Sequence, residues 1–173
     1  MRPPIFTKAD GGKLEIGTYA LTRLFYFVQD TPNKNEAGGL LLGRHIVDST
    51  DIVVDEVTVP EPGDIRRRYG FYRARRRHQA IIDRRWRESG GTCVYLGEWH
   101  THPEDHPTPS DVDQRDWKRK LRDDIFDGDY LYFVIVGKRS LRIWEAAKRG
   151  SHCMLIGEHC HFGADGVEND NPT

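Results

Sequence analysis

Seven consecutive residues, Tyr130 to Val136, read YLYFVIV and contain no charged side chain. An apolar run of this length is typical of a central strand, which is covered on both faces. Such a strand needs further layers of structure above and below its sheet. Because the rest of the chain mixes helical and strand-like patterns, the sequence predicts an α/β fold, specifically an α+β sandwich.

Three stretches have the periodicity of a helix with one buried face. Thr18 is expected to cap the first, in which apolar residues recur at i, i+3, i+4 and i+7. A second helix is predicted over 71–88, where apolar residues and His78, expected as a packed histidine, step by three or four positions. Ser110 is expected to cap a third helix over about 111–123.

Strands are predicted where short apolar and β-branched runs are bounded by turn residues. Two of them, separated by a turn at 48–50, are expected to pair, and the last is expected to form a hairpin with the run that begins at Tyr130. The predicted strands cover 36–47, 51–59, 92–99, 130–136 and 139–145.

Length and composition favour one globular domain. The 173 residues are close to the usual size of a single core, which is assigned to 1–163, and the acidic, Asn-rich segment 164–173 is expected to be a flexible tail. No run of about 18 apolar residues is present, and the first residues lack the apolar core of a signal peptide. Three cysteines at no disulfide spacing fit a reducing compartment. We therefore expect a cytoplasmic protein without a membrane segment.

The charges are distributed unevenly along the chain. Residues 65–87 contain ten arginines and one acid, a surplus of nine, which leaves −10 for the remainder because the net charge is −1. This basic segment, Arg66 to Arg87, is interpreted as a solvated helix face or as a surface for an acidic protein partner. Nucleic acid is the less favoured partner, because the interleaved aromatic residues can belong to the core.

The stretch GEWHTHPEDHPTPSDVD, residues 97–113, has the composition of a metal site. Alternation along a strand places His100 and His102 on one face, about 6.6 Å apart, within reach of one Zn²⁺. Three prolines then turn the chain out of the strand toward the helix that begins near Ser110. His106, between the two, is expected at the rim of the site, where it can touch substrate.

Asp113 shares a helix face with Trp117 and Leu121, so its carboxylate points inward and needs a cation. The alternative is a capping box formed with Ser110. Two histidines and one carboxylate provide three ligands for tetrahedral Zn²⁺ and leave the fourth position for water, as in catalytic zinc sites.

Two glutamates compete for the role of general base. Glu98 has the parity of His100 but lies about 13 Å along the strand from His102, so it is also a candidate for fixing an imidazole from outside the ligand set. Glu36 stands before the glycine-rich GGLLLG, and spacing alone does not place it near the zinc site. Ser110 is a candidate to stabilise a developing oxyanion.

Glu36, His100-Thr-His102, Ser110 and Asp113 reproduce the pattern Glu…His-x-His-x₇-Ser-x-x-Asp. With EAGGLLLG and VYLGEWHTHP around them, residues 14–146 resemble the JAMM (JAB1/MPN/Mov34) zinc metalloproteases. The resemblance implies a curved mixed β-sheet flanked by helices, similar to cytidine deaminases. It also implies three zinc ligands (His100, His102, Asp113), an acid/base (Glu36) and an oxyanion stabiliser (Ser110), which leaves Glu98 outside the ligand set.

Members of that family cleave isopeptide or peptide bonds after the C-terminal glycine of ubiquitin or ubiquitin-like proteins. The chain looks most like the bacterial JAB isopeptidases of CBASS anti-phage operons, which release a cGAS-like nucleotidyltransferase from conjugates made by an E1/E2-like system. The expected partner is thus a protein with an extended C-terminal tail or an isopeptide-linked conjugate. Three alternatives are a processing peptidase for a ubiquitin-like sulfur carrier, a non-catalytic scaffold and a RadC-like nucleic-acid-associated protein.

A second group of metal-binding residue types occurs near the C-terminus. Cys153 and Cys160 are separated by six residues, whereas zinc sites prefer two to four. A structural hairpin is therefore favoured over a second metal site that would also use His152, His159 and His161.

Overall fold

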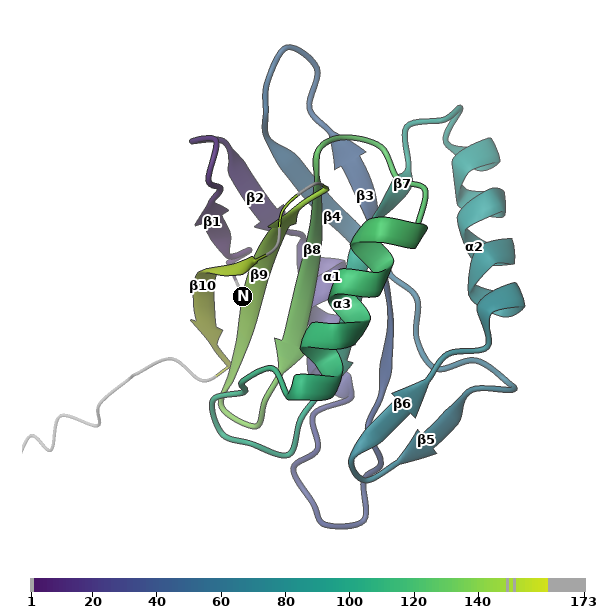
Figure 1. Ribbon diagram of the computed structural model, residues 1–173, viewed down its shortest axis with the longest axis vertical. Helices are drawn as coiled ribbons and strands as arrows, with labels where there is room; N and C mark the ends of the chain where they lie inside the picture. The colour runs from purple at the N-terminus through teal and green to yellow at the C-terminus, as the bar shows by residue number, and fades with distance from the viewer. Residues whose placement is uncertain (1, 149, 151, 162–173) are drawn as a thin grey trace, which may run out of the picture.

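The computed structural model describes residues 2–148, 150 and 152–161 (Figure 1). Within this part of the chain, one mixed sheet has eight strands in the order β1-β2-β4-β3-β7-β8-β9-β10, and β5 pairs with β6 in a separate hairpin. The elements are β1 Ile5–Thr7, β2 Lys13–Ile16, α1 Thr18–Tyr26, β3 Gly38–His45, β4 Ile52–Val57, β5 Ile65–Arg67, β6 Gly70–Tyr72, α2 Arg75–Glu88, β7 Val94–Thr101, α3 Asp111–Asp123, β8 Tyr130–Val136, β9 Ser140–Ala147 and β10 Cys153–Cys160.

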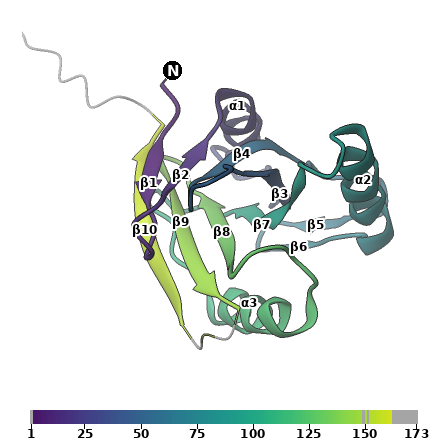
Figure 2. The same cartoon turned by 90° about the horizontal axis from the view of Figure 1, so that it is seen from above.

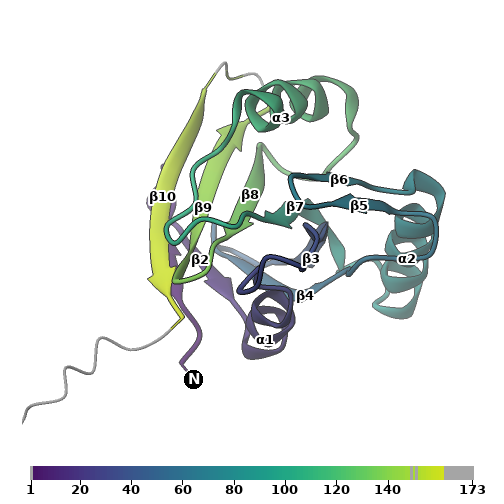
Figure 3. The same ribbon diagram turned by 90° about the horizontal axis from the view of Figure 1, so that it is seen from below.

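The sheet is curved and covered on both faces. Figures 2 and 3 show α1 and α3 on opposite sides of it, with α2 and the β5–β6 hairpin at one flank. The curvature brings the edge strands β1 and β10 together, so that Phe6 packs over Gly157. The expected α/β architecture with a curved mixed sheet is confirmed.

The central strand β8 divides the core in two. Its residues alternate between the core beneath α1, which receives Tyr132 and Val134, and the core beneath α3, which receives Phe133 and Ile135. Trp117 of α3 stacks on Phe133, with ring centroids 4.6 Å apart. An apolar run with two buried faces is thus explained by a helix on each side of the sheet.

The boundaries of two predicted helices need correction. Residues 70–72 form β6 rather than the start of the second helix, because Phe71 packs against Gly38 and the Asp64 carboxylate holds the backbone N–H of Ala74. α2 therefore begins only at Arg75.

The residue preceding α1 is Gly17, and the Thr18 side chain makes no capping hydrogen bond, since Thr18 already lies inside the helix. The pairing of β3 with β4 and of β8 with β9 agrees with the sequence prediction. The predicted tail, 164–173, lies outside the described residues. No helix in the described part of the chain is long and apolar enough to cross a membrane.

A β-bulge lies in β7 just before the motif residues. The register with β3 shifts between Leu41, opposite Gly97, and Leu42, opposite Tyr95. Gly97 has φ +148, and a Cβ atom there would lie 1.8 Å from the carbonyl oxygen of Tyr132. A bulge re-aims the side chains that follow it, so Gly97 helps to set the direction of the strand that carries His100.

We expect Gly97→Ala to lower the free energy of unfolding by at least about 2 kcal/mol, because backbone strain and overpacking add. The control is Gly11→Ala, which has φ +87 but nothing within 4 Å of the added atom and should cost only about 1 kcal/mol. Chemical denaturation measures both values. Equal losses for the two variants would contradict the proposed close contact with Tyr132.

Candidate metal centre

The end of β7 and the first turn of α3 bring two histidines and an aspartate together. The Nε2 atoms of His100 and His102 are 3.1 Å apart. Asp113 completes the triangle, with Oδ1 3.2 Å from the His100 Nε2 and Oδ2 3.4 Å from the His102 Nε2. His102 lies one residue beyond β7, and its backbone N–H still bonds the carbonyl of Val136 in β8.

These distances suit a bound divalent cation. Ligand atoms about 2.0 Å from a tetrahedral metal are separated from one another by about 3.3 Å. Two imidazole nitrogens that face each other at 3.1 Å repel unless they share a proton or a cation. The donor set of two nitrogens and one carboxylate oxygen therefore fits Zn²⁺, and the residues present can hold it.

The electrostatic environment keeps the Asp113 carboxylate ionised. Burial alone raises its pKa, but hydrogen bonds from His100 and His102, together with one from Ser110, hold the pKa far below the ordinary range of aspartate. For His102, burial lowers the pKa, whereas its contacts with Asp113 and Glu36 raise it more, so the net shift is upward. The site thus favours a negative Asp113 carboxylate beside a positive or metal-bound His102 imidazole.

Ser110 connects this site to the helix cap. Its backbone N–H and its Oγ both donate to Asp113 Oδ2, at 2.7 and 2.6 Å, and its Oγ accepts from the Asp113 N–H at 3.2 Å. This is a complete capping box. The two interpretations of Asp113 are therefore compatible, because one carboxylate caps α3 and also faces the histidines.

Glu36 lies on the other side of the histidines, just before β3. Its side chain is only 7% exposed, and it forms with His100 and His102 a group whose ligand atoms all lie within 4.8 Å of one another. Burial raises the pKa of this carboxyl, although the histidines oppose the shift. Asp113 lies closer to both imidazoles, at the separation expected of a shared ligand sphere. Glu36 therefore suits a role beside the metal rather than on it.

The backbone of Glu36 is held on both sides. Its N–H donates to the carbonyl of Arg67 at 2.8 Å, and its carbonyl accepts from Arg66 Nε at 2.9 Å. The next residue, Ala37, bonds the Oγ1 of Thr101, which lies between the two histidines. The hairpin and β7 together fix a residue that is 64 positions away from His100 in sequence.

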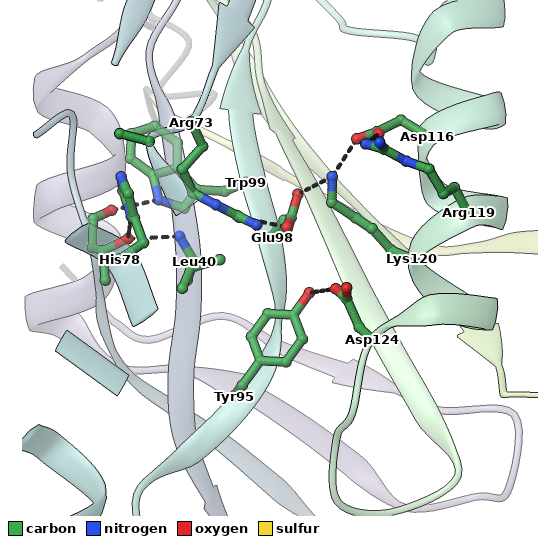
Figure 4. Close-up of polar contacts among 12 residues, drawn as sticks. Leu40, Arg73, His78, Tyr95, Glu98, Trp99, Asp116, Arg119, Lys120 and Asp124 are labelled. Atoms are coloured by element: carbon green, nitrogen blue, oxygen red, sulfur yellow. Dashed lines mark hydrogen bonds and ion pairs between the residues drawn. The ribbon is translucent and has the colours of Figure 1, made fainter. Parts of the chain in front are cut away.

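Two residues expected near the site have other partners. Glu98 binds Arg73 and Lys120 rather than an imidazole, as Figure 4 shows. The imidazole-fixing role expected for it is therefore wrong, since two cations hold its carboxylate on the floor of the cleft.

His106 is not found at the rim of the cleft. Its Nδ1 lies 3.0 Å from Ser140 Oγ and 2.7 Å from Glu158 Oε1, on β9 and β10. The loop from Pro103 to Pro109 folds back over the β8–β9 turn, where the carbonyl of Asp105 accepts from the N–H of Arg139. This path takes the imidazole of His106 away from the histidine pair.

All five residues of the sequence pattern line an open cleft of about 1060 Å³: Glu36, His100, His102, Ser110 and Asp113. One wall is formed by the β5–β6 hairpin and the start of α2, the other by α3, and β7 forms the floor. Arg73 and Lys120 also line it, and neither was singled out from the sequence. The sequence position of Lys120 could have indicated its place in the cleft, because it lies two helical turns after Asp113 and so shares its face. Nothing in the sequence distinguishes Arg73 from the other nine arginines clustered around it.

The C-terminal cysteines and histidines do not gather into a comparable group. Cys153 and Cys160 stand at opposite ends of β10, about 23 Å apart for an extended strand. β10 pairs antiparallel with β9, which confirms the structural hairpin. In the part of the chain that the structure describes, the residues grouped at metal-binding distances lie around the histidine pair: Asp113 on one side and Glu36 on the other.

Two imidazoles and a carboxylate that converge at a cleft, beside a second, buried carboxylate, define the site of a metal-dependent hydrolase. The family described as prokaryotic homologs of the JAB domain matches residues 20–147. The chain belongs to this family and is a JAMM-type hydrolase.

Relatives of known name agree with this assignment. A protein of Pseudomonas aeruginosa named CD-NTase/cGAS isopeptidase is 46% identical over 116 residues, 67% of this chain and 72% of its own length. A Vibrio cholerae protein of the same name is 36% identical over 70% of this chain and 74% of its own length. A solution structure of a Desulfitobacterium hafniense protein, 25% identical, has a TM-score of 0.54 and covers 80% of this chain and 87% of that one.

The charges around Asp113 predict how the stability of the metal-free protein depends on pH. The pKa of His102 is raised by folding, so its contribution is complete below about 6.5 and is lost as the pH rises through the folded pKa. The pKa of Asp113 is lowered, so its contribution is present above about 3.9 and is lost in acid. The contribution of these two groups to the free energy of unfolding should thus be greatest between about pH 3.9 and about pH 6.5.

Chemical denaturation at about pH 5.5 and about pH 8 measures this effect in the metal-free protein, which should be less stable at the higher pH. Asp113→Asn should flatten the dependence, whereas Asp111→Asn in the same helical turn should preserve it. An identical pH dependence in the two variants would contradict the assigned pairing.

Proposed function

We propose that the protein is a zinc-dependent isopeptidase that cleaves after the C-terminus of a ubiquitin-like protein or of a protein conjugated by a bacterial E1/E2-like system. A cGAS-like nucleotidyltransferase is the proposed conjugated protein, since the relatives above are named CD-NTase/cGAS isopeptidase. The observation that carries the proposal is the convergence of His100, His102 and Asp113 beside the buried Glu36.

His100, His102 and Asp113 would hold the zinc, which supplies Lewis-acid activation of water and of the scissile carbonyl. Glu36 is the proton carrier. Its burial favours the protonated form, so the carboxylate readily accepts a proton from the attacking water and later delivers it to the leaving amine.

Ser110 is the proposed hydrogen-bond donor to the developing oxyanion. Ser110 lines the cleft, and its hydroxyl donates a hydrogen bond to Asp113 Oδ2 at 2.6 Å. To donate a hydrogen bond to the substrate oxygen, the hydroxyl must therefore rotate away from Asp113. The backbone N–H of Ser110 would continue to hold that carboxylate at 2.7 Å.

The shape of the cleft favours an extended protein tail. It is open along its length between the hairpin wall and α3, and the proposed metal ligands lie on its floor and on one wall. An extended chain advances about 3.3 Å per residue, so several substrate residues fit on each side of the scissile bond. A conjugate joined through its C-terminus presents such a tail.

We expect Glu36→Gln to bind one zinc ion per chain and to lose cleavage by about 10²–10⁴-fold, because general-base catalysis contributes a factor of that order. His100→Ala should instead lose the zinc itself. Zinc content is measured by metal analysis, and cleavage on a purified nucleotidyltransferase conjugate. Full activity of the Glu36→Gln protein would contradict the proposed role of Glu36 as the proton carrier.

The same assay separates the alternatives. A linear fusion to a ubiquitin-like sulfur carrier that is cleaved while the conjugate is not would favour the processing peptidase. A wild-type protein with far less than one zinc per chain would favour a non-catalytic scaffold.

The basic segment contains two sets of arginines with different contacts. Arg66 and Arg68 donate to backbone carbonyls, and Arg73 and Arg85 bind carboxylates. These four have structural roles. A second set lies exposed at one end of α2 beside the cleft, and its side chains make no hydrogen bond or ion pair to the described residues: Arg75, Arg76 and Arg77.

We propose that these three arginines bind an acidic surface of the protein substrate. They occupy the first turn of α2, which has no acidic residue and no side-chain cap. Positive charge is unfavourable at a helix N-terminus, so an approaching carboxylate gains from the arginines and from the helix dipole together. The net charge of −10 on the rest of the chain disfavours the same partner elsewhere.

Reversal of all three charges, Arg75→Glu, Arg76→Glu and Arg77→Glu, should lower kcat/KM for the protein conjugate by about tenfold or more at low salt. Cleavage of a short peptide confined to the cleft should change much less, because only Arg75 of the three lines the cleft. Helix α2 itself should not be weakened, because acids suit a first turn.

The matched control reverses Arg115, Lys118 and Arg122 on the exposed face of α3. An equal loss in that control would contradict a localised docking surface. Steeply salt-dependent binding of duplex DNA that only the α2 variant loses would assign the surface to nucleic acid instead.

A further inference from the structure

Glu98 joins three separate elements across the floor of the cleft. Its Oε2 lies 2.8 Å from Lys120 Nζ of α3, and its Oε1 accepts a hydrogen bond from Arg73 Nη1, in the segment between β6 and α2. The side chains of Glu98 and Lys120 are only 13% and 11% exposed. Figure 4 shows this ion-pair bridge extending from the hairpin wall to α3.

The bridge links β7 to α3 at a second point, in addition to the contact of His100 with Asp113 at the metal centre. Glu98 precedes His100 by two residues on β7, so both side chains point to the same face. Lys120 follows Asp113 by seven residues on α3, about 10 Å along the helix axis. Polar contacts hold α3 to β7 along its length: Asp113 to the histidines at its start, Lys120 to Glu98 further along, and Asp124 to Tyr95 at its end. A helix held at several such points cannot pivot freely about any one of them.

Neighbouring contacts hold the charged groups of the bridge in place. Lys120 also binds Asp116 one turn earlier on α3, which fixes the ammonium group relative to the helix. The nearby Asp124 already accepts a hydrogen bond from Tyr95, so Glu98 is the acid that holds Arg73. Without Glu98, Arg73 would lose its ion-pair partner, and Lys120 would keep only Asp116 of its own helix. The ion-pair link between the two walls of the cleft would then be lost, and a partly buried cation left without its partner would favour a wider cleft.

We propose that Glu98 is a positioning residue of the metal centre. It sets the orientation of α3 through Lys120, and thereby the place of Asp113 at the two histidines. Through Arg73 it sets the width of the cleft that receives the substrate tail. The effect on substrate rests on the proposed function, whereas the effect on α3 and on metal affinity does not require that the protein be an isopeptidase.

A positioning role differs from a purely structural one in what it changes. A structural ion pair contributes to unfolding free energy alone. Displacement of Asp113 weakens metal binding, and a wider cleft raises KM. Partners that orient a ligand from outside the metal sphere typically change metal affinity by about 10–100-fold.

The test compares Glu98→Gln with Glu56→Gln. Glu56 is a matched control, because its side chain is 23% exposed and binds an arginine, Arg85, at 2.6 Å, but on β4 away from the cleft. Zinc affinity is measured by chelator competition, and α3 mobility by amide hydrogen exchange in the metal-free protein. KM and kcat are measured on a short peptide substrate.

We expect Glu98→Gln to lower zinc affinity by about tenfold or more, to accelerate amide exchange along α3 and to raise KM more than it lowers kcat. Glu56→Gln should leave all three unchanged, and Glu98→Asp should recover part of the zinc affinity. The double variant Glu98→Gln with Lys120→Met should lose less affinity than the two single changes predict, because it removes a cation left without its partner.

Equal zinc affinity and equal α3 exchange in Glu98→Gln and in the wild type would overturn the inference. So would a loss that Glu56→Gln reproduces in full. A wild-type protein that binds no zinc would refute the proposed function but not this inference, which the exchange rates of α3 in the metal-free protein would then decide.

Discussion

The structure of the site depends on one carboxylate that is shared by two elements. Asp113 closes the capping box of α3 and also faces His100 and His102 at the end of β7. A capping residue must occupy the first turn of its helix, so the position of the helix start and the position of the carboxylate are determined together. The stacking of Trp117 on Phe133 holds the same helix face against the central strand. The apolar core and the polar site therefore share one geometric constraint, the placement of α3 on the sheet.

The scaffold beneath the site is rigid because β7 and β8 are buried from both sides. A parallel pair of strands with both faces covered cannot change register without exposing apolar side chains. The bulge at Gly97 then directs the last residues of β7 toward α3. The charged wall of the cleft lies on the flank, where the hairpin and α2 supply Arg73 and the exposed arginines. A buried scaffold thus positions polar groups that surface segments contribute, as is common in binding and catalytic sites.

How much could be predicted from the sequence depended on whether an interaction was local. Strand β8 and the capping box were predictable, because apolar runs and cap spacing act over a few residues. Glu36 could be assigned only through resemblance, since its approach to the histidines is created by the pairing of β3 with β7. The start of α2 was misplaced because Phe71 continues the helical spacing but packs on Gly38 instead. Glu98 was assigned the wrong partner, because the cations that hold it come from the hairpin flank and from α3.

The two acids beside the histidines are driven in opposite directions by their surroundings. Asp113 accepts hydrogen bonds from both imidazoles, which keeps its pKa far below that of an ordinary aspartate in spite of burial. Glu36 is also buried, but its carboxylate accepts no such hydrogen bond from the described residues, so desolvation prevails and its pKa is raised. One acid is thus suited to remain a charged ligand and the other to exchange a proton. When environments separate the pKa values of neighbouring carboxyl groups, they assign different chemical roles to residues of the same type. The sequence pattern names both acids, but it is their burial and their hydrogen bonds that distinguish them.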